Sequence, residues 1–594
     1  MSNHPFAEQR SLFKAYDVRG DNALFTEAFI RAFAQAFARQ LAKSQVRRLV
    51  IGYDMRQASQ TIAQQLAFAI ADCGIEVIWL GLVSTPMMAF WANEYDGHGV
   101  IATASHSERH ICGIKWLLFG ESPGSEDIIH LYDSLLTVPP SASLDQPVTQ
   151  LPVTYLDQKS VHQRYLMQAV KAIHAIKDHV ASTVPCRGVF ADSDSDKADE
   201  ASTHSPAMTS PTVLNPIKPF KVVIDCLNGA TGPIAHAFFA QFETLCHEVI
   251  VLNEVPDGDF PFGNPDPTEP GRLESLKVAV LAHQADIGLG FDGDGDRLMV
   301  VDNRGKILAP DHLLYLLAKV AIEDSIPAQS RSASDSSTRS GRATPYKKED
   351  GQANFAKATC PPTVIFDVKC SHHLPALIEQ MGAQPYMSKT GSSIMRKALQ
   401  SGSSQALFAG ELSGHFLFND GYFVLHDDAM YAALRLIYWL SRRPDSLADI
   451  VAKLPAMINT PDVYLPLKSH DYTSSVDERP LLAKLAKLCQ RLQSGCSSDS
   501  NPAFFSQGRL LPLTGSRKLG LPANTRLTCI DGIRLDFTNG FGVIRPSNTS
   551  HCLTVRFAGN TLADLRAIQQ RFVALCEYID TDLAGQIAKI RPSS

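Results

Sequence analysis

Short apolar runs alternate with helical patterns over much of the chain. Three runs rich in Val and Ile predict buried strands: RRLVIGYD ends at Asp54, KVVIDC ends near Asp225, and TVIFDVKC ends near Asp367. Each run is followed by a loop and then by a helical stretch. This alternation is typical of α/β units with a mostly parallel sheet.

One helix can be placed together with its start. The apolar side chains that recur every four residues, and therefore share one face of a helix, are Phe29, Phe33, Phe37 and Leu41. Thr26 stands just before them, where a threonine side chain can cap the first turn. The pattern therefore predicts a helix that begins after Thr26.

Two segments, 187–213 and 328–360, follow neither apolar period and are rich in Ser, Asp, Thr and Ala. Such segments cannot offset the entropy of ordering by burial, so we interpret both as flexible insertions. A weaker candidate of the same kind runs over 494–507.

A polar loop follows each of the three strand–helix beginnings, and two of these loops contain glycine. These loops are TASHS at 103–107, GFDGDGDR at 290–297 and GELSGH at 410–415. The repeat favours three similar α/β domains with mixed sheets, each presenting one functional loop. Beyond about residue 456 the pattern changes, and RPSNTS at 545–550 precedes a strand-like LTVRF, which favours a C-terminal α+β domain. The predicted domains are 1–154, 155–309, 310–455 and 456–594.

Length and composition agree with four domains, because 594 residues divide into about four units of ~150 residues. The net charge of -6 provides no basic field for nucleic acid or an anionic membrane. The sequence starts without a signal-peptide pattern and holds no apolar run of about 18 residues. Twelve cysteines form no C-x-x-C pair. We expect reduced thiols and a cytoplasmic protein.

The acidic loop DGDGDR is the most specific local signal. Asp292, Asp294 and Asp296 alternate with glycines, and three carboxylates so close together repel one another unless a cation lies among them. Oxygen ligands favour Mg²⁺ or Ca²⁺. An EF-hand is rejected, because position 12 of such a loop would be Asn303 and position 6 would be Arg297. A solvated acidic turn is the alternative.

The other loops are weaker when each is taken alone. Ser105 beside His106 is a serine–histidine pair, which is commonly a turn rather than a catalytic centre. GELSGH offers a carboxylate and a hydroxyl that suit paired sugar hydroxyls. RPSNTS offers a guanidinium with hydroxyl and amide donors, which is a phosphate-binding set in chemical terms. Polar turns are the alternative for both.

Taken together and in order, these loops resemble the α-D-phosphohexomutase family, and within it the bacterial phosphomannomutase/phosphoglucomutase branch. The matching stretches are FKAYDVRG at 13–20, TASHS with GIKW at 113–116, GFDGDGDR, DVKC at 367–370, KTG at 389–391, GELSGH and RPSNTS. The resemblance implies four domains around a central cleft. It also implies interconversion of hexose 6-phosphate and hexose 1-phosphate through a phosphoserine and a hexose 1,6-bisphosphate.

The resemblance further implies a role for each matching residue. Ser105 would carry the phosphate and bind one Mg²⁺ together with Asp292, Asp294 and Asp296. His106, Lys115 and Arg19 would assist catalysis. The substrate would be bound by Tyr16, Arg297, Lys369, Thr390, Gly391, Glu411, Ser413, His415, Arg545, Ser547, Asn548 and Thr549. We expect small hexose phosphates as partners, with a monomer or weak dimer as the assembly.

The chain departs from the family pattern in two loops. The serine loop continues with Ser107 and Glu108, where Asn and Pro are usual, and Cys112 stands before Gly113. After KTG the chain has Ser392, where relatives often carry histidine. Two alternatives therefore stay open: a phosphoglucosamine mutase, and a non-catalytic descendant that binds sugar phosphates. Leu412 favours the mannose and glucose branch, which usually has Met there.

Overall fold

The structure, a computed structural model, describes most of the chain. The described residues are 6–137, 153–183, 218–325, 361–401, 405–466, 480–492, 511–512, 518–519, 521–522, 524–547 and 552–593. The three predicted insertions lie outside these ranges, as do Asn548 and Thr549.

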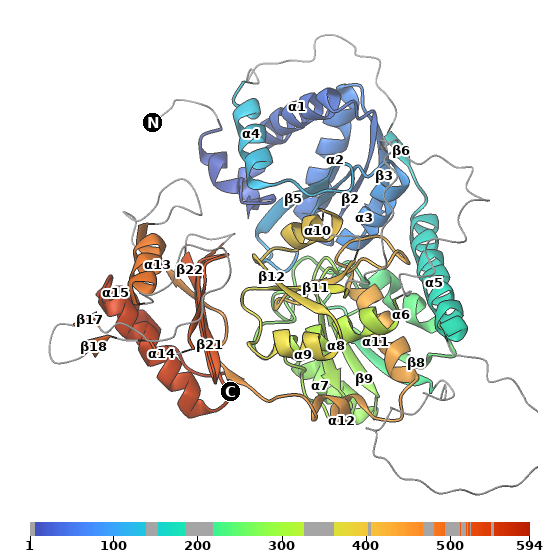
Figure 1. Ribbon diagram of the computed structural model, residues 1–594. Coiled ribbons are helices and arrows are strands. Elements are labelled where there is room, and N and C mark those ends of the chain that lie inside the picture. The colour runs from blue at the N-terminus through green and yellow to red at the C-terminus, as the bar shows by residue number, and fades with distance from the viewer. Residues whose placement is uncertain are drawn as a thin grey trace, which may run out of the picture.

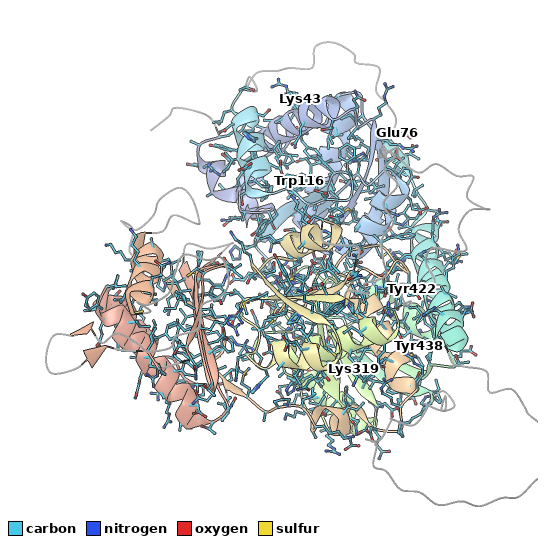
Figure 2. The ribbon with its side chains drawn as sticks, viewed as in Figure 1. Lys43, Glu76, Trp116, Lys319, Tyr422 and Tyr438 are labelled. Carbon is cyan, nitrogen blue, oxygen red and sulfur yellow. The ribbon has the colours of Figure 1, made fainter. Side chains whose placement is uncertain are left out.

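The first unit is a mixed sheet with helices. Its strands, in spatial order, are β1 (Val18–Asp21), β5 (Ile111–Leu117), β4 (Gly99–Ala102), β2 (Arg48–Tyr53), β3 (Glu76–Leu82) and β6 (Val153–Tyr155). Its helices are α1 (Glu27–Lys43), α2 (Gln57–Asp72), α3 (Thr85–Glu94) and α4 (Ser125–Leu135), with short turns η1 (Glu8–Leu12) and η2 (Asn22–Leu24). The helix predicted after Thr26 is α1, and the Thr26 side chain accepts a hydrogen bond from Phe29 N. Trp116, which Figure 2 labels, lies in this unit. Its ring packs edge-on against Phe37 at 5.6 Å between ring centroids.

The second and third units repeat this sheet with fewer strands. The second contains β10 (Leu298–Asp302), β9 (Ile287–Phe291), β7 (Phe220–Asp225) and β8 (Cys246–Leu252), with α5 (Gln158–Thr183), α6 (Gly232–Ala240) and α7 (Glu274–Ala282). The third contains β12 (Gln384–Ser388), β11 (Thr363–Asp367), β13 (Ala406–Gly410) and β14 (Phe416–Phe418), with α8 (Pro310–Glu323), α9 (Leu374–Gln380), α10 (Ser392–Ser401), α11 (Ala429–Ser441) and α12 (Leu447–Val451). The strands ending at Asp54, Asp225 and Asp367 are β2, β7 and β11, the parallel strands at the centre of each sheet.

The three predicted functional loops occupy the same topological position. In each unit a parallel strand leads into a strand that pairs with it antiparallel: β4 with β5, β9 with β10, and β13 with β14. The serine loop, the acidic loop and GELSGH are the connections within these three pairs. The repeat predicted from the sequence is therefore also present in the topology.

The fourth unit is an α+β fold. Its antiparallel sheet contains β15 (Ile458–Asn459), β22 (Cys552–Gly559), β21 (Gly540–Pro546), β20 (Ile533–Phe537) and β19 (Arg526–Thr528), with β16 (Val463–Pro466) also paired to β22. Its remaining elements are α13 (Pro480–Leu492), α14 (Leu562–Glu577), α15 (Thr581–Ala588) and a small ribbon of β17 (Leu511–Pro512) and β18 (Lys518–Leu519). The predicted fold class, three α/β units and an α+β unit, is confirmed.

One hydrophobic cluster runs through the first three units, whereas the fourth has its own. The shared cluster takes side chains from α3, α5, α8 and α11, and every residue of α11 is buried. The fourth unit's core is formed by its sheet with α13, α14 and α15. Figure 1 shows this unit, in orange and red, beside the other three. The predicted boundary at 154 falls within β6, and the domain boundaries stay predictions.

Candidate active site

The turn after the central strand is built the same way in all three α/β units. The carboxylates of Asp54, Asp225 and Asp367 each accept a hydrogen bond from the backbone nitrogen two residues later, at 3.0–3.1 Å. An aspartate side chain that bonds its own backbone two residues on stabilises a tight turn. These aspartates therefore shape the edge of each sheet from which the functional loops extend.

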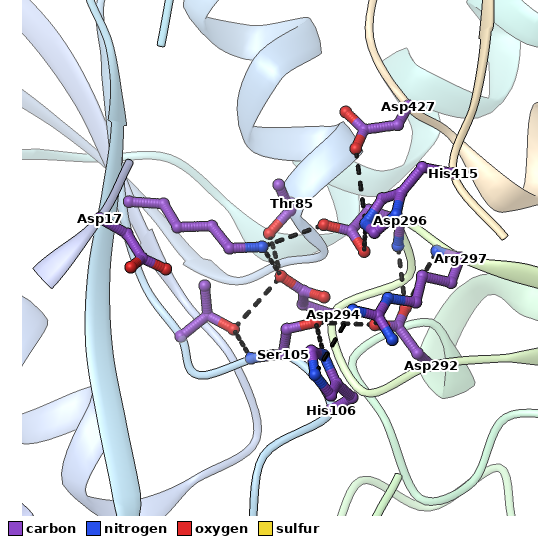
Figure 3. Close-up of polar contacts among 12 residues, drawn as sticks. Asp17, Thr85, Ser105, His106, Asp292, Asp294, Asp296, Arg297, His415 and Asp427 are labelled. Atoms are coloured by element: carbon purple, nitrogen blue, oxygen red, sulfur yellow. Dashed lines mark hydrogen bonds and ion pairs between the residues drawn. The ribbon is translucent and has the colours of Figure 1, made fainter. Parts of the chain in front are cut away.

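Ser105 lies in a strained, buried turn. Its φ of +51° is in the left-handed region, which is unfavourable for a residue with a side chain. The Ser105 hydroxyl donates to Asp292 Oδ2 at 2.7 Å and lies 3.1 Å from His106 Nδ1 (Figure 3). Neighbours on a strand would point apart, but this turn brings the hydroxyl and the imidazole together.

Arg56 supports the serine loop by hydrogen bonds to its backbone. This role was not predicted from the sequence. The Arg56 guanidinium pairs with Asp54 at 2.7 Å and donates to the carbonyl oxygens of Ser105, at 3.0 Å, and Ser107. Arg56 follows Asp54 by two residues, as Lys369 follows Asp367. That repeated Asp-x-basic spacing was the signal that could have found it.

The predicted metal ligands converge. One oxygen from each of Asp292, Asp294 and Asp296 lies within 4.8 Å of the others. Asp292 Oδ1 accepts from the backbone nitrogens of Asp296 and Arg297, which fixes the turn. Gly293 lies so close to the serine loop that an added Cβ would be 2.6 Å from Ser105 O. The acidic loop and the serine loop therefore pack directly together.

The charge of this cluster is only partly balanced by the protein. Burial, and then Asp296 and Asp294, raise the pKa of Asp292 well above its usual value. Burial also raises the pKa of Asp294 and Asp296, but Lys115 together with Thr85, for Asp294, and with His415, for Asp296, holds both below their usual range. Asp294 Oδ1 is buried without a hydrogen-bond partner among the described residues. An unpaired buried oxygen among three carboxylates fits a hard divalent cation.

Lys115 joins the first unit to this loop. Its ammonium lies 2.7 Å from Asp294 and 3.0 Å from Asp296 (the unlabelled lysine in Figure 3). Burial lowers the pKa of Lys115, but the two aspartates raise it further, so the ammonium stays charged. Thr85 Oγ1 also donates to Asp294 Oδ2 at 2.6 Å, a contact the sequence did not indicate.

His415 joins the sugar loop to the acidic loop. Its Nε2 lies 3.2 Å from Asp296 Oδ1, and its Nδ1 lies 3.0 Å from Ser413 Oγ. Burial lowers the pKa of His415, but Asp296 and Glu411 raise it to about 10, so the ring is an imidazolium. Glu411 in turn accepts from Gly391 N at 2.6 Å and from Ser413 at 2.7 Å.

One pocket is lined by many of the residues predicted to take part in catalysis or substrate binding. Among its lining residues are Tyr16, Arg19, Ser105, His106, Lys115, Asp296, Arg297 and His415. Arg19 is held by Asp17 at 2.6 Å and donates to the carbonyl oxygen of Ala104, so it is directed at the serine loop. Arg297 pairs with Asp266 at 3.4 Å, and its Nη2 lies 3.4 Å from His106 Nε2.

A second group of predicted substrate-binding residues lies where the fourth unit contacts the third. Arg545 pairs with Asp531, and the same carboxylate accepts a hydrogen bond from Thr390 N at 3.2 Å. Lys369 pairs with Asp462 of the fourth unit at 2.6 Å. Ser547 is buried at the end of β21. These residues form one group, and the pocket around Ser105 forms another. The sugar loop and Gly391 lie between the two groups. A Cβ added at Gly391 would be 3.5 Å from Tyr16 Oη, which lines the pocket around Ser105.

The departures from the family pattern are accommodated. Glu108 is exposed and lies 3.4 Å from His110 Nδ1, so the extra carboxylate points away from Ser105. Ser392 and Ser393 line the pocket itself.

Comparison with known proteins identifies the family of the chain. Family models described as phosphoglucomutase/phosphomannomutase α/β/α domains I, II and III match residues 10–131, 207–305 and 349–458. The chain belongs to the phosphoglucomutase/phosphomannomutase family. The resemblance recognised from the ordered loops is confirmed, and with it the enzyme class, since mutases of this family are isomerases.

Curated relatives cover nearly the whole chain. A phosphomannomutase/phosphoglucomutase of Pseudomonas syringae pv. tomato is 30% identical, with 96% of each chain covered. A phosphoglucomutase of Neisseria gonorrhoeae is 29% identical, covering 96% of this chain and 97% of that protein. A family protein from Burkholderia thailandensis has the same fold, with a TM-score of 0.67 at 24% identity over 98% of this chain and 99% of that one. Among the described residues of this chain, no helix is long and apolar enough to cross a membrane.

Proposed function

We propose that this protein interconverts hexose 6-phosphate and hexose 1-phosphate, with mannose and glucose as the sugars, through a phosphoserine at Ser105. One observation carries the proposal. The Ser105 hydroxyl lies 2.7 Å from Asp292 in a pocket that Lys115, Arg19 and His106 also line. A serine in a pocket with two cations, Lys115 and Arg19, and next to an acidic cluster suits a phosphate group better than it suits attack on a carbonyl.

The first transfer moves the phosphoryl group from Ser105 Oγ to the free hydroxyl of the hexose phosphate. The bond from phosphorus to Ser105 Oγ breaks, and a bond from phosphorus to the sugar oxygen forms. The sugar hydroxyl gives up its proton and Ser105 Oγ gains one, and His106 Nδ1, 3.1 Å from that oxygen, is placed to handle the exchange. Arg19 and Lys115 neutralise charge on the transferring group.

The acidic loop supplies the metal site. Asp292, Asp294 and Asp296, with the phosphate on Ser105, would hold one Mg²⁺, which when bound offsets negative charge around the transferring group. The ligand set contains only oxygen atoms, which favours Mg²⁺ over softer metals.

The product of the first step is a hexose 1,6-bisphosphate, which must turn end for end before the second transfer. Glu411 and Ser413 would hold sugar hydroxyls in both orientations, and Arg545, Ser547, Asn548 and Thr549 would hold the phosphate that is not reacting. The fourth unit has its own core, and it meets the third through the small apolar cluster around Val368 and Phe541, so movement of the fourth unit would change that contact and leave the shared cluster intact. We also propose that the bisphosphate acts as an activator, that the protein is cytoplasmic, and that it is a monomer or weak dimer.

The experiment that tests this proposal combines turnover with intact mass. The purified protein is incubated with mannose, glucose and glucosamine 6-phosphates, and each 1-phosphate formed is measured. We expect turnover of the two neutral hexoses and a phosphate adduct on Ser105 that substrate removes. A Ser105→Ala variant with full activity contradicts the mechanism, and turnover of glucosamine 6-phosphate alone contradicts the choice of sugar.

A further inference from the structure

Arg396 is a buried cation in the active-site pocket that no predicted role includes. It lies on α10 of the third unit, is 3% exposed, and lines the same pocket as Ser105, His106 and Lys115. Its Nη2 donates to Ser122 Oγ of the first unit, on the segment between β5 and α4. Because α10 belongs to the third unit and Ser122 to the first, this hydrogen bond spans the junction of the two units.

The charge of Arg396 is poorly compensated by the protein. Its nearest ion-pair contact is Asp427 Oδ1 at 4.0 Å, beyond hydrogen-bonding distance. Asp427 is shared with two histidines, because its Oδ1 lies 2.8 Å from His426 Nδ1, though without hydrogen-bond geometry, and its Oδ2 lies 3.8 Å from His415 Nε2. Arg396 Nη1 is buried without a hydrogen-bond partner among the described residues. A buried guanidinium with an unused edge is costly unless an anion binds to it.

The other acidic groups of the pocket do not supply that anion. Asp17 is paired with Arg19 at 2.6 Å, and Asp296 with Lys115 at 3.0 Å. The pocket therefore carries surplus positive charge at Arg396. Ser392, one helical turn earlier on α10, lines the same pocket with a short side chain that leaves room for a ligand beside the guanidinium.

We propose that Arg396 binds a phosphate group of the hexose phosphate, with Nη1 facing the phosphate and Nη2 anchored on Ser122. This inference rests on the proposed function and deepens it, because it adds a phosphate-binding residue in the pocket around Ser105, apart from Arg545 in the fourth unit. A guanidinium is suited to this task, since its planar fork serves an anchor and a phosphate oxygen at once. By contacting the first unit as well, Arg396 couples phosphate binding to closure of the pocket between α10 and β5.

The test compares two variants, Arg396→Gln and Arg396→Lys, with the control Lys397→Gln. Lys397 is the next residue of α10 and does not line the pocket, so the control removes one positive charge outside it. Steady-state kinetics with mannose and glucose 6-phosphates give KM and kcat. Calorimetry with inorganic phosphate gives anion affinity without turnover. We expect Arg396→Gln to raise KM and the phosphate dissociation constant roughly tenfold or more, with a smaller loss in kcat, and Lys397→Gln to leave both unchanged.

The Lys variant keeps the charge but loses the fork, so its phosphate affinity is expected between those of the wild type and Arg396→Gln. Wild-type phosphate affinity in Arg396→Gln overturns the inference. If that variant does not fold, wild-type affinity in Arg396→Lys overturns it instead. A wild-type protein that turns over no hexose phosphate contradicts the proposed function separately, because the phosphate-binding comparison does not depend on catalysis.

Discussion

Arg545 and Asp531 form a buried ion pair, with Arg545 Nε 2.7 Å from Asp531 Oδ2. The pair leaves Arg545 Nη2 buried without a hydrogen-bond partner among the described residues, and the same carboxylate accepts from Thr390 N. Asp531 therefore holds the guanidinium by its Nε edge, leaves Nη2 unpaired, and ties the fourth unit to the third.

Asp531→Ala tests this positioning role. Without the carboxylate, Arg545 loses its orientation, so we expect KM for hexose 6-phosphate to rise roughly tenfold. Asp531→Asn keeps one acceptor oxygen, which can accept from both Arg545 Nε and Thr390 N as Oδ2 does, so KM is expected to stay within about threefold of the wild type. Steady-state kinetics on both variants give the answer, and equal KM values for Asp531→Ala and wild type would contradict it.

Gly293→Ala tests the packing of the acidic loop on the serine loop. The new Cβ would meet Ser105 O at 2.6 Å and Pro265 Cγ at 2.9 Å, so one loop must shift. A displacement of about 1 Å at reacting groups costs roughly a hundredfold in rate, and we expect kcat to fall by that order while the thermal midpoint changes little. Gly585→Ala, on α15 with open space around it, is the matched control and should keep full activity.

Arg56→Met tests the support under the serine loop. The change leaves Asp54 as a buried, unpaired carboxylate and frees the carbonyl oxygens of Ser105 and Ser107. Breaking a buried pair in this way costs about 3–5 kcal/mol, so we expect a large loss of stability together with loss of phosphate on Ser105. Denaturant unfolding and intact mass measure the two effects. A variant as stable as the wild type would show that the pair is dispensable.

Magnesium is expected to stabilise the protein through the three carboxylates of the acidic loop. At a hundred times the dissociation constant, a ligand specific for the folded state adds about 2.7 kcal/mol. Asp292→Asn should lose this stabilisation by Mg²⁺. It should not lower the thermal unfolding midpoint of the metal-free protein, because it removes one of three mutually repelling carboxylates. Thermal unfolding with Mg²⁺ and with chelator measures it. Asp259→Asn, at an exposed aspartate, should keep the full increment.

Acid is expected to weaken the contact between the third and fourth units at His372. This ring packs 6.2 Å from the Phe541 ring of the fourth unit, and the charged or titratable groups facing it are His373, Asp536 and Arg534. Burial, and then His373, lower the pKa of His372 to about 4. Below about pH 6.5 the unfolded chain binds a proton that the folded chain does not, so stability falls as pH drops from about 6.5 to 4.

His372→Gln should flatten that pH dependence, and thermal unfolding at pH 7, 5.5 and 4.5 measures it. His130→Gln, at an exposed histidine on α4, is the control and should follow the wild type. An identical pH slope in His372→Gln and wild type would contradict the assignment.

The sequence predicted the parts that depend on local patterns. The strands ending at Asp54, Asp225 and Asp367 and the helix after Thr26 follow from apolar periodicity and capping, which are properties of short segments. The ordered loops were sufficient to identify the family.

The sequence could not predict contacts made across long separations. Arg56 reaches Ser105 over 49 residues, and Arg396 reaches Ser122 over 274. Asp531 and Asp462 acquire their roles only when the fourth unit lies against the third. Each is a single charged residue in an unremarkable local context, and only the packing of the units gives it a partner.

The three functional loops share one position in the fold. The three units each offer the same connection between a parallel and an antiparallel strand, and hydrogen bonds within each sheet hold both ends of that connection. A sequence change in one loop can therefore leave its sheet and the other two loops intact. Under the proposed function, one such connection would hold a nucleophile, one a cation and one a sugar, so a single repeated piece of backbone would serve three separate tasks.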